Sequence, residues 1–288
     1  MSLYGHRIHG MLYKHKIVLF FFLFSLPFKS FSSFTIRPYS EIGLFMGTSY
    51  YLGELNHVHF PLGTHPIRPA GGLFYRYNLN GHYAIRAFVN YGEVGGSDSN
   101  SENVFEQNRA LSFKSFVLEA GSILEFNFYE FALYKDAKRI VTPFIFGGLN
   151  YFYFNPQGNL NGTWVDLQPL GTEGQGSSAF PDRKKYFRHQ VAIPMGIGVK
   201  VKLQRFAITA EWGIRKTFTD YLDDVSTTYV DPKLLSAEAA QMSNKSSLSS
   251  ESLINKQRGD SKTTDWYVFT GITVSFKLGK EPICRDTN

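Results

Sequence analysis

Histidines at a possible metal-ligand spacing occur early in the chain. His57 and His59 are two residues apart, so their side chains would share one face of a strand, and His65 follows nearby. Zinc is commonly bound by such nitrogens, but this segment is predicted as a loop with no carboxylate or thiol at ligand spacing. We interpret the three as surface or interface histidines and predict neither a metal nor another cofactor.

Four aspartates could instead supply the oxygen ligands that calcium prefers. They are Asp220, Asp223, Asp224 and Asp231. Their spacing matches no EF-hand loop, so we predict that they cap helices and accept hydrogen bonds within a loop. Asp231 precedes Pro232, a pair that favours the start of a short helix, here over residues 233–240.

A serine beside a histidine would be needed for nucleophilic catalysis. His189 could be paired with Ser177 or Ser178. However, no histidine falls inside a predicted strand, because His82 lies at a turn and His189 at the start of a strand. We therefore predict no catalytic residue and no enzyme activity, and keep an enzyme built on His189 as an alternative.

Charged residues of both signs stand inside segments that are otherwise apolar. Buried opposite charges must pair, because an uncompensated charge away from water is costly. We predict that they form one network of ion pairs. The residues are Glu41, Arg76, Arg86, Glu119, Glu125, Lys200, Glu211 and Arg215.

The segments that carry these charges alternate with a period of two. Between residues 190 and 203 every odd position is apolar, whereas the even positions are small or cationic, ending with Lys200 and Lys202. Residues 206–215 repeat the pattern with the opposite parity. Successive side chains of a strand point to opposite faces, so each segment is predicted as a strand with one apolar and one polar face.

Eight such strands are predicted, and their connections differ in length. Asn80-Gly81 and Gln204-Arg205 are tight turns, the former a strong hairpin signal, and residues 128–140 form a connection of intermediate length. The other connections are long, polar and rich in glycine and serine, above all 155–189 and 219–265. The predicted strands are 41–52, 68–78, 83–91, 112–126, 141–154, 190–203, 206–215 and 266–277.

Alternating strands joined by turns at one end and long loops at the other are typical of a transmembrane β-barrel. A secreted lipocalin-type barrel also has eight strands, but its apolar face points inward. Paired charges can fill the narrow interior of eight strands, and 16% aromatic residues suit girdles at the two membrane interfaces. We predict an all-β chain: an eight-stranded antiparallel β-barrel of outer-membrane type.

The N-terminus is typical of an export signal. Lys14 and Lys16 precede an apolar run of about ten residues, too short for a spanning helix. We predict a signal peptide over residues 1–32 and the barrel over 33–288, with Met11 as a possible alternative start. Cys284 is the single cysteine, so no disulfide can form within the chain. The net charge is +6, but the basic residues are scattered, and no nucleic-acid partner is predicted.

Several stretches resemble a family of outer-membrane proteins, the PorG family of the type IX secretion system. The resemblance implies a small barrel that associates with a periplasmic ring of PorK and PorN proteins; a Ser-rich insertion at residues 243–252 departs from it. The stretches are 68–77 (RPAGGLFYRY), 124–128 (LEFNF), 169–176 (PLGTEGQG), 215–225 (RKTFTDYLDDV) and 257–260 (QRGD).

The resemblance leads to a functional prediction. We expect a non-enzymatic component of a type IX secretion system in the outer membrane of a Gram-negative bacterium, with outer-membrane lipids around it and both termini in the periplasm. The alternatives are a barrel enzyme that modifies lipid A and a narrow passive pore. The candidate interface for the ring lies in the 128–140 connection, where aromatic and cationic residues mix. Its residues are Phe131, Leu133, Tyr134, Lys135, Lys138 and Arg139.

Overall fold

The structure is a computed structural model, and it describes residues 37–56, 67–101, 103–134, 137 and 139–279. The predicted signal peptide, His57, His59, His65 and the ends of the chain lie outside these residues. Within them, no helix is both long and apolar enough to cross a membrane.

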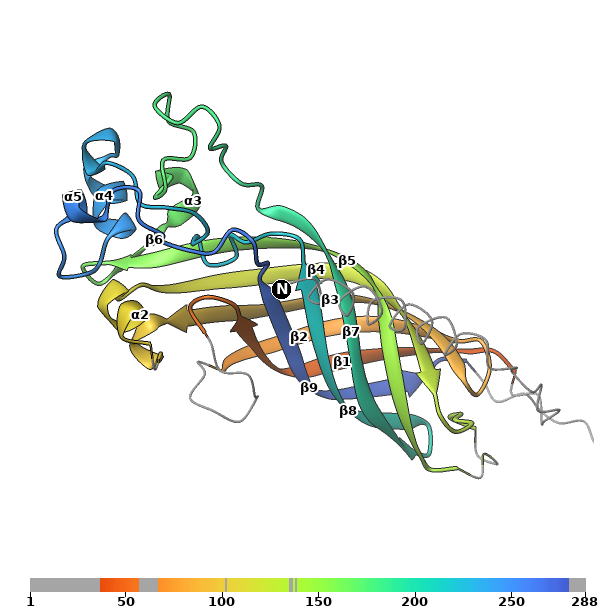
Figure 1. Cartoon of the computed structure of the whole chain (residues 1–288). Helices are drawn as coiled ribbons and strands as arrows, with labels where there is room; N and C mark the ends of the chain where they lie inside the picture. The colour runs from red at the N-terminus through yellow and green to blue at the C-terminus, as the bar shows by residue number, and fades with distance from the viewer. Residues whose placement is uncertain (1–36, 57–66, 102, 135–136, 138, 280–288) are drawn as a thin grey trace, which may run out of the picture. The chain divides into compact units, whose positions relative to one another are not determined.

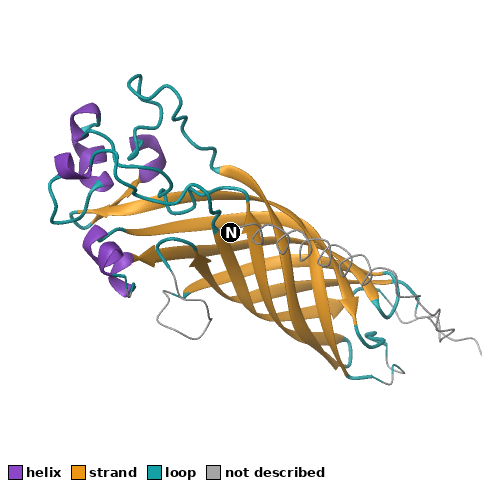
Figure 2. Ribbon diagram, in the orientation of Figure 1, coloured by secondary structure: helices purple, strands orange, loops and turns teal. Residues whose placement is uncertain are grey.

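Eight strands close into an antiparallel β-barrel, as predicted (Figures 1 and 2). Each strand pairs with its neighbours in the chain, and β9 closes the barrel by pairing with β1 along its whole length. A further short strand, β6 (Thr163–Asp166), pairs with β5 outside the barrel wall. The barrel strands are β1 (Tyr39–Leu52), β2 (Arg68–Asn78), β3 (Tyr83–Ser97), β4 (Ser112–Asn127), β5 (Val141–Leu160), β7 (His189–Leu203), β8 (Phe206–Thr217) and β9 (Trp266–Lys277).

One end of the barrel, the turn end, carries the short connections. Leu203 pairs with Phe206 across Gln204-Arg205, and Gln204 adopts a positive φ of 58°, as a two-residue hairpin requires. Between β2 and β3, the Asn80 side chain accepts hydrogen bonds from the backbone N–H groups of His82 and Tyr83. These turns have the bounds expected from the sequence.

The opposite end, the loop end, is asymmetric because β3, β4 and β5 extend beyond the other strands (Figure 1). The prediction that a loop begins at residue 155 was wrong, since β5 continues to Leu160 and turns back through Asn161 and Gly162 into β6. Both turn residues have positive φ, so the extension is a β-hairpin rather than irregular chain.

Short helices lie among the loops at this end (Figure 2). The predicted helix over 233–240 is instead two elements, because Asp231 caps a single 3₁₀ turn and Ser236 begins a new helix. The helices are η1 (Asp98–Asn100), α2 (Val104–Arg109), α3 (Leu167–Leu170), η2 (Pro232–Leu234), α4 (Ala237–Ser243) and α5 (Ser250–Leu253).

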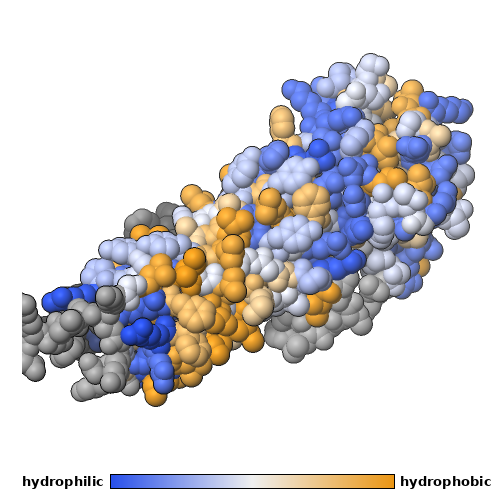
Figure 3. Space-filling model, turned by 180° about the vertical axis from the view of Figure 1, so that it is seen from behind, coloured by the Kyte–Doolittle hydropathy of each residue, from blue (hydrophilic) through white to orange (hydrophobic). Residues whose placement is uncertain are grey.

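The apolar face of each strand points out of the barrel. Met46, Leu73 and Ile197 each expose more than half of their surface, and Figure 3 shows apolar side chains gathered over the barrel wall with hydrophilic ones over the loops. The inward face instead holds the charged residues with a cluster of buried side chains, Phe74, Phe88, Ile123, Phe144 and Phe146. The barrel is therefore apolar outside and polar inside.

Candidate functional site

Glu125 of β4 is the centre of an ion-pair network in the lumen. Its carboxylate lies 2.9 Å from Nε of Arg76, 2.9 Å from Nε of Arg86 and 2.6 Å from Nζ of Lys200. These cations come from three different strands, β2, β3 and β7, and all four side chains are at most 5% exposed. One carboxylate thus ties four strands together across the interior.

The network continues on both sides of Glu125. Arg76 also pairs with Glu41 at 2.7 Å, and Arg86 pairs with Glu211 at 2.7 Å. Further along the lumen, Arg215 pairs with Glu119 at 2.9 Å. The structure therefore places all eight charged residues predicted from the alternation inside the barrel, each with an opposite charge.

Neutral donors complete the lumen, and the sequence interpretation missed them. Tyr267 donates to Oε2 of Glu119 at 2.8 Å, and the amides of Asn90 and Asn150 donate to the same carboxylate. The Asn78 side-chain amide likewise donates a hydrogen bond to the Glu41 carboxylate at 2.7 Å. Each of these residues lies at an inward-facing position of its strand. The alternation pattern in the sequence could therefore have predicted that their side chains point into the lumen.

Little free space remains between these side chains. The gap bounded by Phe74, Arg86, Phe146 and Glu211 has a volume of about 10 Å³, at the lower limit of what one water molecule needs. Phe74 and Phe146 are also faced by the Arg86 guanidinium, 5.2 and 5.5 Å from the ring centres. The described interior is a packed core, as small barrels allow.

Residues 128–134 of the connection after β4 cover the turn end, and here the predicted interface needs correction. Phe131 and Leu133 are only 1% and 0% exposed and pack against Tyr39 and Ala207. These two side chains fill the turn end of the barrel, so they are not exposed for contact with a partner protein. The physical reason is that an apolar run beside an open barrel end buries more surface by folding into it than by facing water.

Polar contacts hold this cap in place. Lys202 of β7 donates to the carbonyls of Tyr134 and Ala137 at 3.0 and 2.6 Å, and Tyr134 donates to the carbonyl of Arg37 at 2.8 Å. Arg139 is exposed and lies over the Tyr129 ring. Of the other predicted interface residues, Tyr134 is half-buried, and Lys135 and Lys138 lie outside the described residues.

At the loop end, distant segments meet in a second buried polar cluster. The Glu173 carboxylate accepts hydrogen bonds from the backbone N–H groups of Ser226 and Thr227 and lies 2.9 Å from the Arg258 guanidinium. Asp224 accepts from Thr172 at 2.5 Å and from Tyr186 at 2.7 Å. Three of the stretches singled out in the sequence, 169–176, 215–225 and 257–260, thus contact one another.

Tyr51, at the end of β1, anchors a neighbouring carboxyl pair. Its hydroxyl lies 2.7 Å from Oδ2 of Asp223 and 2.5 Å from Oδ1 of Asp265, and it accepts a hydrogen bond from the Glu54 backbone N–H at 3.1 Å. Asp223 and Asp265 are 1% exposed. Burial raises the pKa of Asp223 to about 7 and that of Asp265 well above its usual range, with the neighbouring carboxylate contributing to the latter.

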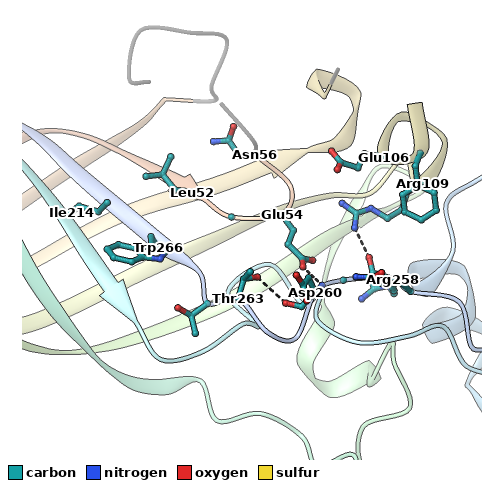
Figure 4. A pocket seen from close by; sticks show the side chains of 15 residues that line it. Leu52, Glu54, Asn56, Glu106, Arg109, Ile214, Arg258, Asp260, Thr263 and Trp266 are labelled. Carbon is teal, nitrogen blue, oxygen red and sulfur yellow. Dashed lines mark hydrogen bonds between the residues drawn. The ribbon is translucent and has the colours of Figure 1, made fainter. Parts of the chain in front are cut away.

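Glu54 borders a cavity of about 680 Å³ beside this pair (Figure 4). Figure 4 shows the Glu54 side chain pointing toward Asp260, and its carboxylate accepts a hydrogen bond from the Asp260 backbone N–H. Arg109 lines the same cavity, donates to the Arg258 carbonyl and pairs with Asp98 at 2.7 Å. Burial, together with Asp223, raises the pKa of Glu54 to about 8, and burial is also the main cause that raises Asp220 to a pKa of about 8.

The remaining sequence candidates do not form a catalytic or metal site in the described residues. On the outside of the barrel, the His189 ring stacks on Tyr151 and makes a tilted contact with Tyr153, and no hydrogen bond of the described chain joins it to Ser177 or Ser178. No group of three or more metal-binding side chains suited to an ion occurs among the described residues. Of the aspartates considered for calcium, Asp223, Asp224 and Asp231 accept hydrogen bonds from Tyr51, Thr172, Tyr186 and backbone groups instead.

Comparison with known families adds a sequence-level assignment. The family described as a domain of unknown function, DUF6089, matches residues 16–168 and 175–286. The chain belongs to this family. The match of DUF6089 includes every barrel strand, whereas Thr172 and Glu173 of the loop-end cluster lie between its two matched stretches. No curated protein matches the sequence.

Among solved structures, this DUF6089 chain is similar to small outer-membrane barrels. Ail, the attachment invasion locus protein of Yersinia pestis, is 10% identical over 84% of this chain and 100% of that chain, with a TM-score of 0.40. Neisserial surface protein A is 10% identical over 85% and 100%, with a TM-score of 0.35. OprG from Pseudomonas aeruginosa is 10% identical over 84% and 98%, also with a TM-score of 0.35.

Proposed function

We propose that this barrel resides in the outer membrane of a Gram-negative bacterium as a non-enzymatic anchor for a periplasmic ring of a type IX secretion system. In this proposal the turn end and both termini face the periplasm, and the loop end faces outward. The observation that carries the membrane location is a barrel that is apolar outside, with aromatic contacts on its outer surface and ion pairs in its interior.

The outer surface supports the membrane location. Aromatic contacts form one girdle near the loop end, where Phe116 meets Tyr91 and Tyr153, and another near the turn end, where Phe126 meets Tyr83 and Phe128. Phe116 and Phe126 are ten positions apart on β4. With a rise of about 3.4 Å per residue and a tilt of about 45°, the girdles are about 24 Å apart, close to the apolar height of outer-membrane barrels.

A substitution on the outer face tests this location. Ile197→Arg places a charge on the 59% exposed position between the girdles, and we expect it to lower the free energy of unfolding by about 2–4 kcal/mol in lipid bilayers. Leu203→Arg, at the last residue of β7, is the matched control and should cost at most about 1 kcal/mol. Equal costs for the two positions, measured by urea unfolding, would contradict a membrane around this surface.

The packed lumen favours an anchor over the alternative of a passive pore. Glu125 and its three cations cross the interior from β2 to β7, and the residual gap described above is too small for a solute. The purified protein should therefore show no steady conductance in planar bilayers. The enzyme alternative has less support, because His189 faces the outside of the barrel, where its ring contacts two tyrosines.

The assignment to a secretion system rests on the stretches that resemble the PorG family. The geometry adds that ring proteins in the periplasm could reach the turn end only, where the cap exposes Arg139 beside Tyr129. Because Phe131 and Leu133 are buried, the proposed contact surface consists of the outer side of the cap and the neighbouring turns.

Cross-linking from the two ends tests the proposed partner. A photo-reactive amino acid at position 139 should capture proteins of the PorK and PorN type, whereas one at position 248, where Leu248 is exposed at the loop end, should not. Arg139→Glu should reduce copurification of the ring and secretion of cargo without changing the heat-modifiable gel mobility of the barrel. Ring capture from position 248 alone, or normal secretion by the Arg139 variant, would contradict the proposal.

A further inference from the structure

The Tyr51 hydroxyl has one proton but two carboxyl neighbours. It lies within hydrogen-bond distance of Asp223 and Asp265 and also accepts from the Glu54 backbone N–H. A hydroxyl can donate one hydrogen bond and accept two. All three contacts are satisfied only if one aspartate is ionised and accepts from Tyr51, while the other is protonated and donates to it.

The outer oxygens of the pair are already used. Oδ1 of Asp223 accepts from the Val225 backbone N–H at 2.9 Å, and Oδ2 of Asp265 accepts from the Leu222 backbone N–H at 2.8 Å. The shared proton therefore lies on the inner side, between the carboxyl groups and Tyr51. It joins three parts of the chain: the end of β1, the 219–225 segment, and the residue just before β9.

This junction holds both ends of the longest loop. Residues 218–265 connect β8 to β9, Asp223 lies near the start of the loop, and Asp265 is its last residue. The Asp265 carbonyl also accepts from Thr217 at 2.5 Å, and its N–H donates to the Thr219 carbonyl at 3.0 Å. Loss of the proton would leave two adjacent buried carboxylates at the point where the loop is fastened to the barrel.

The surroundings contain more carboxyl groups than cations. Within the described residues, the guanidinium groups that face this pair are those of Arg109 and Arg258, and each is already paired, with Asp98 and with Glu173. The titratable acids packed around them come from the turn after β1, from η1 and from the loops that precede β7 and β9. They are Glu54, Asp98, Glu173, Asp220, Asp223, Asp224, Asp260 and Asp265.

We propose that Tyr51, Asp223 and Asp265 form a proton-dependent latch that keeps the 218–265 loop closed over the barrel in acid and releases it in alkali. This is a property of the loop end and does not depend on the proposed partner at the turn end. The pH would then determine whether the 218–265 loop at the loop end is accessible to other molecules.

The direction follows from the pKa values of the closed state. Burial raises the pKa of Asp223 to about 7 and those of Glu54 and Asp220 to about 8, against about 4 for such groups in water. The closed loop thus binds protons more tightly than the open loop. Its stability is fully present below about pH 4, falls as the pH rises, and stops falling above about pH 8.

Hydrogen–deuterium exchange on the full chain in detergent tests the latch. Rates corrected for the intrinsic effect of pH should show protection of peptides from residues 219–230 and 257–265 falling at least about tenfold between about pH 5 and about pH 9. Peptides from β4 serve as the internal reference and should keep their protection.

Variants separate the latch from general instability. Asp265→Asn resembles the protonated carboxyl and should keep the loop protected at about pH 9. Asp182→Asn removes an exposed carboxylate elsewhere in the loops and should leave the wild-type pH dependence unchanged. Tyr51→Phe removes the bridge and should expose the loop even in acid, with heat-modifiable mobility showing that the barrel is folded. Protection that is independent of pH in the wild type, or unchanged pH dependence in Asp265→Asn, would overturn the proposal.

Discussion

The lumen and the loop end each hold a buried cluster of charges, but the two clusters are balanced differently. In the lumen, the four carboxylates of the network face four cations, and the described interior has little space for water. At the loop end, the carboxyl groups outnumber the guanidinium groups of Arg109 and Arg258. A balanced cluster can stay ionised in a buried site, whereas an acid-rich one must bind protons or open.

The difference separates a permanent part of the molecule from a conditional one. The lumen pairs join strands that are also held by continuous backbone ladders, so they fill the barrel at every pH at which their carboxylates are ionised. The loop-end segments are joined by a short backbone bridge between Thr228 and Gln257 rather than by a continuous ladder. Side chains such as Glu173 and Arg258 add the contacts that bring the 169–176 segment to this bridge. We therefore expect substitutions to affect barrel stability in the first region and loop closure in the second.

The largest effect is expected at Glu125. Arg76, Arg86 and Lys200 share the Glu125 carboxylate, and Arg76 and Arg86 each have a second carboxylate partner. Glu125→Gln therefore removes the ion pair of the buried Lys200, and leaving a buried charge uncompensated typically costs about 3–5 kcal/mol. Urea unfolding followed by gel mobility measures this cost. The matched control is Glu238→Gln, an exposed carboxylate on α4, which should leave barrel stability unchanged; similar costs for both would remove the distinction between the two regions.

Much of the barrel could be predicted from the sequence because its pattern is local. The strand bounds of β2 and β9 followed from the turn signals and the alternation, and the alternation placed the eight charges on one face of their strands. That this face points inward followed from the presence of charges of both signs, which can pair in the narrow interior of eight strands. The extensions of β3 and β5 were missed, since residues such as Gly95, Gly96 and Asn155 interrupt the alternation where the strands rise above the apolar band.

Contacts between distant segments could not be predicted in the same way. Glu173 and Arg258 are 85 positions apart, and no periodicity links them. Phe131 and Leu133 illustrate a second limit: an apolar pair in a connection indicates burial, but not whether a partner or the same chain covers it. The choice between the two depends on the open end of the barrel, a feature that exists only after the sheet has closed.

A smaller effect, confined to the loop end, is expected at Arg258. Arg258→Gln removes the cation between Glu173 and Asp224, so closure of the loops would need additional protons. Burial already raises the pKa of Asp224 to about 6 despite Arg258, and without the cation this pKa should rise further. We expect the pH at which the 257–265 peptides lose protection from exchange to fall by at least about one unit, while the urea midpoint of the barrel stays unchanged. A lowered midpoint would show that the two regions are not independent.

The smallest effect compares two glycines on neighbouring strands of the barrel wall. A side-chain carbon at Gly198 of β7 would lie 2.5 Å from the Phe144 ring in the lumen, whereas at Gly147 of β5 the nearest atom would be 3.8 Å away on the outer face. Gly198→Ala should therefore cost about 1–3 kcal/mol through overpacking, and Gly147→Ala should be neutral or stabilise by at most about 1 kcal/mol, because it restricts the unfolded chain. Both are read from urea unfolding, and both should leave exchange at the loop end unchanged. If Gly198→Ala were as mild as Gly147→Ala, the lumen would have room to adjust, and the contrast between a tightly packed barrel and a loop end that opens would be weaker than these distances indicate.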